Sequence, residues 1–125
     1  GAGSGLMNRK KKFQTMVKTM TSYMGSLGKP FTVKMRTGIK IDKNFAHTLI
    51  PFCRDSGVSM VTLHGRTKDQ RYIKFANWDY IRDCNQLAEP MPLYGNGDIL
   101  SYEDYVEKKN LSNVSDTPSG GYRIL

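Results

Sequence analysis

The stretch Met60-Val61-Thr62-Leu63-His64-Gly65-Arg66 decides the fold of this chain. An apolar, β-branched run ends abruptly in an imidazole, a glycine and a guanidinium, as in a buried strand that delivers polar groups to the rim of a sheet. Side chains alternate along a strand, so Thr62 and His64 share one face while Val61 and Leu63 occupy the other. The stretch therefore predicts a central strand whose carboxyl end carries functional groups.

Two similar runs flank this stretch and suggest a repeated unit. Lys34, His64 and Asn96 are spaced by roughly 30 residues, the length of one strand–helix unit, and each interval holds one helical pattern. The pattern predicts an α/β fold with helices on one face and parallel strands at about 31–36, 59–63 and 92–95. Lys34, His64 and Asn96 should then stand side by side at the carboxyl ends of neighbouring strands, where α/β folds keep their ligands.

Composition narrows the class of protein. The 125 residues are 38% hydrophobic and 24% charged, which is typical of one globular domain with a modest core. A net charge of +8 favours a polyanionic partner such as nucleic acid. No apolar run approaches the roughly 20 residues that cross a bilayer, so we expect no membrane span.

The two cysteines, Cys53 and Cys84, fall inside helical patterns, which favours reduced thiols over a disulfide. Reduced thiols are typical of a protein of the cytoplasm or nucleus. The chain has no C-x-x-C, and its two histidines are far apart in sequence, so we expect no metal site.

The loop after the central strand, residues 67–77, interleaves cations with aromatic side chains. Its cations are Lys68, Arg71 and Lys74, and its aromatic residues are Tyr72 and Phe75. Such a loop suits an RNA surface, where phosphates pair and bases stack. A merely solvated loop explains the same residues equally well.

The remaining elements are expected from periodicity and capping. A helical stripe runs from Phe13 to Leu27, Asp42 can cap the next helix, and Asn77 can cap a third that carries Trp78, Ile81 and Leu87 on one face. Ser101 with Asp104 makes a partial capping box for a last helix through about Lys109. From Asn110 the apolar period disappears, so we expect an ordered domain over 1–109 and an unstructured tail over 110–125.

The turn Gly95-Asn96-Gly97-Asp98 completes the set of residues at the strand ends. A lysine aimed at an electron-rich ring edge can stabilise its reduced anion, and an imidazole beside it can donate a hydrogen bond. Flavin chemistry needs such groups. Satisfied polar residues that cap the strands are the simpler alternative.

Three motifs make a family recognisable. Val33-Lys34-Met35-Arg36-Thr37-Gly38, Leu63-His64-Gly65-Arg66 and Gly95-Asn96-Gly97-Asp98-Ile99 resemble, in order and spacing, the V-K-x-R-x-G, H-G-R and G-N-G-D-I motifs of the flavin-dependent tRNA-dihydrouridine synthases. The connecting sequence is similar to the eukaryotic branch that modifies the variable-loop uridine at tRNA position 47.

The resemblance implies a (β/α)8 TIM barrel with FMN at the carboxyl ends of its strands and NADPH as hydride source. In that family reduced flavin passes a hydride to the uracil C6, and a cysteine acid protonates C5. Carried over by motif, the flavin contacts would be Lys34 and His64, and the cofactor would be lined by Asn96, Gly97 and Asp98. The tRNA side would be met by Arg36 and Arg66, and the loop hypothesis adds Lys68 and Arg71.

The chain departs from the family pattern in extent. A whole barrel needs about 250 residues, whereas this chain offers about three consecutive βα units. The N-x-G-C-P motif with the catalytic cysteine is expected upstream of Gly1, so the chain is interpreted as a partial barrel that is inactive alone. Two alternatives stay open: a barrel enzyme acting on a small phosphorylated metabolite, and a non-catalytic basic RNA-binding module.

Overall fold

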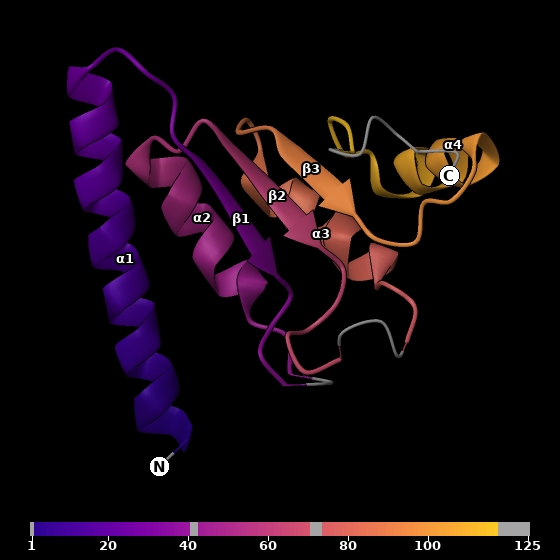
Figure 1. Ribbon diagram of the computed structural model, residues 1–125, viewed down its shortest axis with the longest axis horizontal. Coiled ribbons are helices and arrows are strands. Elements are labelled where there is room, and N and C mark those ends of the chain that lie inside the picture. Colours follow the sequence, from indigo (N-terminus) through magenta and orange to yellow (C-terminus); the bar gives the residue numbers. More distant parts are fainter. Residues whose placement is uncertain (1, 41–42, 71–73, 118–125) are drawn as a thin grey trace.

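Helices and strands alternate along the whole described chain. The computed structural model describes residues 2–40, 43–70 and 74–117. Its elements follow the order α1 (Ala2–Ser26), β1 (Thr32–Arg36), α2 (Ala46–Ser56), β2 (Met60–His64), α3 (Trp78–Ala88), β3 (Leu93–Asn96) and α4 (Tyr102–Ser112) (Figure 1). The three strands were predicted within one residue at each end by the apolar runs.

All three strands are parallel and form one open sheet in the order β1-β2-β3. The prediction of parallel strands joined by helical crossovers is therefore confirmed. This is the arrangement of three consecutive βα units of a partial TIM barrel.

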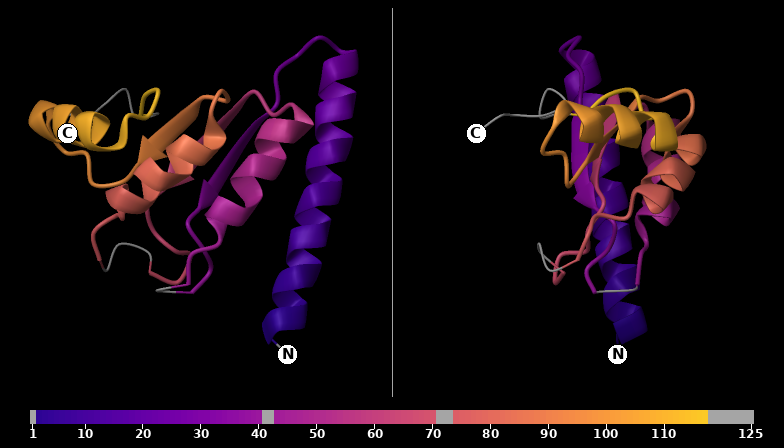
Figure 2. Two further views of the ribbon diagram at one scale, coloured as in Figure 1. Left: turned by 180° about the vertical axis from the view of Figure 1, so that it is seen from behind. Right: turned by 90° about the vertical axis from the view of Figure 1, so that its right-hand side faces the viewer.

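One face of the sheet is covered by helices. α2 and α3 lie behind the sheet in Figure 1 and in front of it in the left view of Figure 2, which confirms the expected single helical face. The apolar side chains of the strands point to this face and are buried there, namely Val33, Val61, Leu63 and Leu93. The core they form with the helices leaves the opposite strand face for polar residues, among them the exposed Lys34.

α1 is less buried than its apolar stripe suggests. Val17 is fully buried, but Met16, Tyr23 and Leu27 are each about half exposed. α1 stands at the β1 end of the sheet and packs mainly against α2, so only one narrow side of the helix meets the core (Figure 1).

α3 shows how capping and packing agree, with one error in the expected face. The side chain of Asn77 accepts a hydrogen bond from the Tyr80 backbone N–H at 3.0 Å, as predicted for its cap. Trp78 and Ile81 are buried, whereas Leu87 is 39% exposed. The buried face continues instead through Cys84, Asn85 and Ala88, which follow the helical period from Trp78 and Ile81.

The predicted caps of α4 and α2 have different outcomes. The Ser101 hydroxyl accepts a hydrogen bond from the Asp104 backbone N–H at 3.1 Å, which confirms the capping residue of α4. α2 begins after Phe45 without a side-chain cap. Asp42, which was expected to cap it, lies outside the described residues.

The expected unstructured tail is wrong for residues 110–117. α4 continues to Ser112, and Asp116 then forms a parallel bridge with Tyr94, beside β3. The backbone N–H of Ser115 donates to the Leu93 carbonyl at 2.9 Å, and the amide of Asn85 donates to the Asn113 carbonyl at 2.9 Å. Backbone hydrogen bonds and the buried Val114 order a segment that has no apolar period. The rest of the tail lies outside the described residues.

Two further expectations concern membrane-spanning helices and the state of the two cysteines. None of the helices in the described part of the chain is long and apolar enough to cross a membrane. Cys53 and Cys84 are both buried and free, as expected of reduced thiols.

Candidate functional site

The carboxyl ends of the strands bring three polar side chains to one level. In the parallel register Arg36 pairs with His64, and His64 pairs with Asn96. Lys34 pairs with Thr62 and so lies two residues earlier on the same strand face. The expectation that Lys34 is level with His64 and Asn96 is therefore wrong by two residues, and Arg36 takes that place.

His64 is a neutral imidazole at the carboxyl end of the central strand, between Arg36 and Asn96. The residue is buried, with only 8% of its surface exposed. Burial lowers the pKa of His64 to about 4, and the positive charges of Arg36, Arg66 and Lys34 act in the same direction, while Asp98 opposes them. At neutral pH the ring therefore carries one proton, on one of its two nitrogens.

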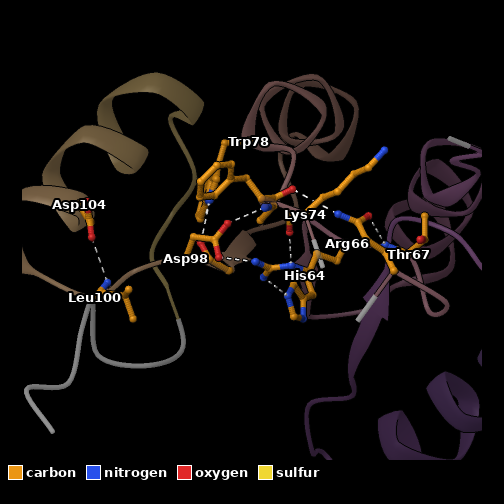
Figure 3. A network of polar contacts seen from close by, with 12 residues as sticks. His64, Arg66, Thr67, Lys74, Trp78, Asp98, Leu100 and Asp104 are labelled. Carbon is orange, nitrogen blue, oxygen red and sulfur yellow. Dashed lines mark hydrogen bonds and ion pairs between the residues drawn. The ribbon is translucent and has the colours of Figure 1, made fainter. Parts of the chain in front are cut away.

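Arg66 is buried beside His64, and groups of the chain itself hold its guanidinium. Its Nη1 lies 3.2 Å from His64 Nε2, its Nε donates to the Lys74 carbonyl at 2.7 Å, and its Nη2 forms an ion pair with the Asp98 carboxylate (Figure 3). Arg66 is only 4% exposed. The expectation that Arg66 faces an RNA is not supported, because its guanidinium is enclosed by the chain's own residues.

Asp98 likewise binds the protein itself. One carboxylate oxygen pairs with Arg66, and the other accepts a hydrogen bond from the Ala76 backbone N–H at 2.5 Å. Asp98 adopts a left-handed backbone conformation with φ of 60°, which is uncommon for a residue with a side chain. These contacts tie the turn after β3 to the loop before α3. The predicted contact of Asp98 with a cofactor stays a prediction.

Gly97 is required by the closeness of this turn to the His64 ring. Its φ is +126°, and a Cβ there would lie 2.6 Å from the Ala76 Cβ and 3.4 Å from His64 Nε2. Its carbonyl accepts a hydrogen bond from the Trp78 indole N–H at 2.8 Å. Gly97 thus lies next to His64. Its predicted contact with a cofactor stays a prediction.

Gly95 and Gly65 serve packing rather than ligand approach. A Cβ on Gly95 would lie 2.5 Å from the Trp78 ring, and one on Gly65 would lie 2.9 Å from the Asn77 backbone nitrogen. The two glycines let α3 and the loop before it pack closely against the strand ends. Sequence reasoning missed this role of Gly95, although the tryptophan at the start of the preceding helical pattern was visible.

The loop expected to meet RNA is only partly described. Lys68, Lys74 and Phe75 are exposed, Phe75 to 88%. Arg71 lies outside the described residues. Arg36 is half-buried, and its Nη1 donates to the Thr67 carbonyl at 3.3 Å, so this cation is partly engaged within the chain.

A cavity of about 770 Å³ lies beside β1, on its unpaired edge. Lys34, Arg36 and Lys68 line it together with apolar residues of α1 and α2, such as Phe13 and Leu49. Positive charge therefore borders an apolar surface at this edge. Across the described residues, no group of histidine, cysteine and acidic side chains could hold a metal ion.

The residues at the strand ends fit a flavin. Lys34 supplies an exposed ammonium group, Arg36 a half-buried guanidinium, and His64 and Asn96 supply neutral hydrogen-bonding groups on the same strand face. An isoalloxazine ring becomes electron-rich on reduction, and nearby cations and N–H donors stabilise that charge.

The sequence matches the family model described as dihydrouridine synthase (Dus) over residues 1–115. A tRNA-dihydrouridine(47) synthase-like protein of Xenopus laevis, whose name gives NAD(P)(+) as its nucleotide, is 59% identical over 104 residues. The human protein of the same name is 56% identical over 104 residues, and a tRNA-dihydrouridine(47) synthase of Coprinopsis cinerea is 40% identical over 130 residues.

These matches cover most of this chain and a small part of each relative. They include 83% of the chain for the Xenopus and human proteins and 96% for the fungal one. The matched region is 16% of the length of the two vertebrate proteins and 19% of the fungal protein. With its family model matched over nearly the whole length, the chain belongs to the dihydrouridine synthase family.

Proposed function

We propose that this chain forms the flavin-binding strand ends of an enzyme that reduces a uridine in tRNA to 5,6-dihydrouridine. The cofactor is FMN, NADPH is the reductant, and the target is the variable-loop uridine at position 47. When bound, FMN would accept a hydride from NADPH and pass it to the uracil ring. Family membership supports this proposal over a barrel enzyme for phosphorylated metabolites and over a non-catalytic RNA-binding module.

The single observation that carries the proposal is the neutral imidazole of His64 among cations at the open strand ends. Lys34 and Arg36 contribute positive charge on the same strand face. A neutral His64 offers one N–H donor without adding a further charge. This set can orient a flavin ring and stabilise negative charge on it, which is the role the proposal gives these residues.

The tRNA contact in this proposal falls to the exposed residues at the same end of the sheet. Lys68 and Lys74 are exposed cations that can pair with phosphates, and Phe75 is an exposed aromatic ring that can stack on a base. The net charge of +8 supports a polyanionic substrate. The acid that protonates the uracil is assigned to a cysteine outside this chain, since Cys53 and Cys84 are buried and burial raises the pKa of both thiols.

The test uses the intact enzyme that contains this chain. Lys34→Ala and His64→Ala should each lower the flavin content of the purified protein or slow flavin reduction by NADPH, because each removes a group beside the ring. Absorbance in the flavin bands and stopped-flow reduction measure both quantities. Lys12→Ala, which removes an exposed cation of α1, is the matched control. Flavin content and turnover that match the wild type in both site variants would refute the assignment.

A further inference from the structure

We propose that Arg66 and Asp98 act together as a positioning clamp, which holds His64 in its neutral Nδ1–H tautomer and fixes the turn after β3 beside it. The functional meaning of the clamp rests on the proposed function, because His64 is there assigned to the flavin. Neither Arg66 nor Asp98 needs to touch the flavin or the tRNA for this role.

The tautomer follows from the chemistry of the guanidinium. An arginine side chain has only N–H donors and stays protonated in proteins. Arg66 Nη1 lies 3.2 Å from His64 Nε2, so Nε2 must accept the hydrogen bond and carries no proton. The single proton of the neutral ring is therefore on Nδ1, and Arg66 selects that tautomer.

Asp98 makes this arrangement of Arg66 stable. A buried guanidinium is costly unless an anion compensates its charge, and Asp98 is the carboxylate that meets it. The second oxygen of Asp98 accepts from the Ala76 N–H, and Arg66 Nε donates to the Lys74 carbonyl. The ion pair is thus fastened at both ends to the loop before α3, and the guanidinium has one orientation, with Nη1 toward His64 (Figure 3).

The charges around His64 predict opposite effects for the two clamp residues. Lys34, Arg36 and Arg66 all lower the His64 pKa, and Asp98 raises it. Arg66→Gln removes a cation and leaves the Asp98 carboxylate without its guanidinium, so the His64 pKa should rise from about 4 toward its ordinary value of about 6.5. Asp98→Asn removes the one anion of the set and keeps the cations, so His64 should stay neutral.

The experiment follows the ring directly, in the intact enzyme labelled with ¹⁵N-histidine. The His64 signals are assigned by their loss in His64→Asn. We expect the Nδ1–H tautomer in the wild type, with no titration above about pH 5, as the depressed pKa requires. In Arg66→Gln the ring should titrate at a higher pH than in the wild type, although burial and the charge of Arg36 still hold its pKa below the ordinary value. In Asp98→Asn the pKa should not rise. An Nε2–H tautomer in the wild type overturns the clamp whether or not any variant folds, and so does an Arg66→Gln ring whose pKa in folded protein stays at the wild-type value.

A flavin readout separates this inference from the proposed function. The pH dependence of flavin absorbance and of flavin reduction by NADPH is measured on the same variants. A flavin transition that lies at higher pH in Arg66→Gln than in the wild type, and that disappears in Arg66→Gln/His64→Asn, supports both the clamp and the flavin assignment. A ring titration seen by NMR without any change in the flavin profile would uphold the clamp and refute the placement of flavin beside His64.

Discussion

Replacement of Gly95 by alanine tests whether this motif glycine serves packing. A Cβ at position 95 would lie 2.5 and 2.7 Å from two carbons of the Trp78 ring and 3.2 Å from the Ile81 Cγ2. Both side chains are buried, and the Trp78 indole is further held by its hydrogen bond to the Gly97 carbonyl at 2.8 Å. The ring therefore cannot move aside without breaking a contact of the turn that holds Asp98.

The expected cost is that of overpacking a core, about 1–3 kcal/mol of the free energy of unfolding. For a chain of this size that corresponds to a fall in Tm of roughly 3–15 °C. Gly25→Ala is the matched control, because position 25 lies within α1 and a Cβ there meets nothing within 4 Å. The same change at Gly25 should raise stability by about 0.5–1 kcal/mol, since alanine favours a helix over glycine.

Urea unfolding followed by tryptophan fluorescence measures both variants. Trp78 is the single tryptophan of the chain, so the signal reports on the ring that the new methyl group would strike. A Gly95→Ala protein with wild-type stability, slope and emission maximum would refute the packing argument. Equal destabilisation by both variants would show that the loss does not arise at the Trp78 contact.

Three other predictions follow from the described residues. The pKa of His64 is about 4 in the folded protein and about 6.5 in the unfolded chain, so between pH 6.5 and pH 4 only the unfolded chain binds a proton at this residue. The free energy of unfolding should therefore fall by up to roughly 3 kcal/mol from pH 7 to pH 4. In urea titrations at each pH, His64→Asn should make the free energy of unfolding less dependent on pH. In the intact enzyme, Lys68→Gln with Lys74→Gln should reduce the slope of log K for tRNA binding against log salt concentration by up to about 0.7–0.9 per lost phosphate contact. An unchanged slope in filter binding would show that the loop is a solvated surface without phosphate contacts. The 125-residue chain alone, supplied with FMN, NADPH and tRNA, should form no dihydrouridine by mass spectrometry of the nucleosides, because its two thiols are buried, and clear product would refute that.

The positions of the strands could be predicted from sequence because their signal is local. Each strand is a short β-branched or apolar run, and the spacing of the runs matches one strand–helix unit. The burial of Val61 and Leu63 on the helical face follows from the same alternation.

The register of the strands could not be predicted in this way. It depends on how the helices and loops between the strands pack, and no single run contains that information. Motif order suggested that Lys34 is level with His64, whereas the sheet pairs Arg36 with it. The tail after Ser112 escaped prediction for a related reason, since it is ordered by backbone hydrogen bonds to β3 and by the side-chain amide of Asn85 in α3, which composition does not reveal.

The site itself shows why residue type alone did not predict the pairing of Arg66 with Asp98. An arginine and an aspartate at the ends of neighbouring strands are each typical of ligand contacts, and a motif gives no reason to pair them with each other. In the structure their charges compensate within the protein. His64 and Asn96 are the last residues of their strands, whereas Arg66 and Asp98 lie just beyond the strands, in loops that contact each other. Figure 3 shows the Arg66–Asp98 pair. In the proposed site the H-G-R and G-N-G-D segments would therefore combine two roles: residues inside the strands would present groups toward the flavin, and residues just past the strand ends would hold those groups in place.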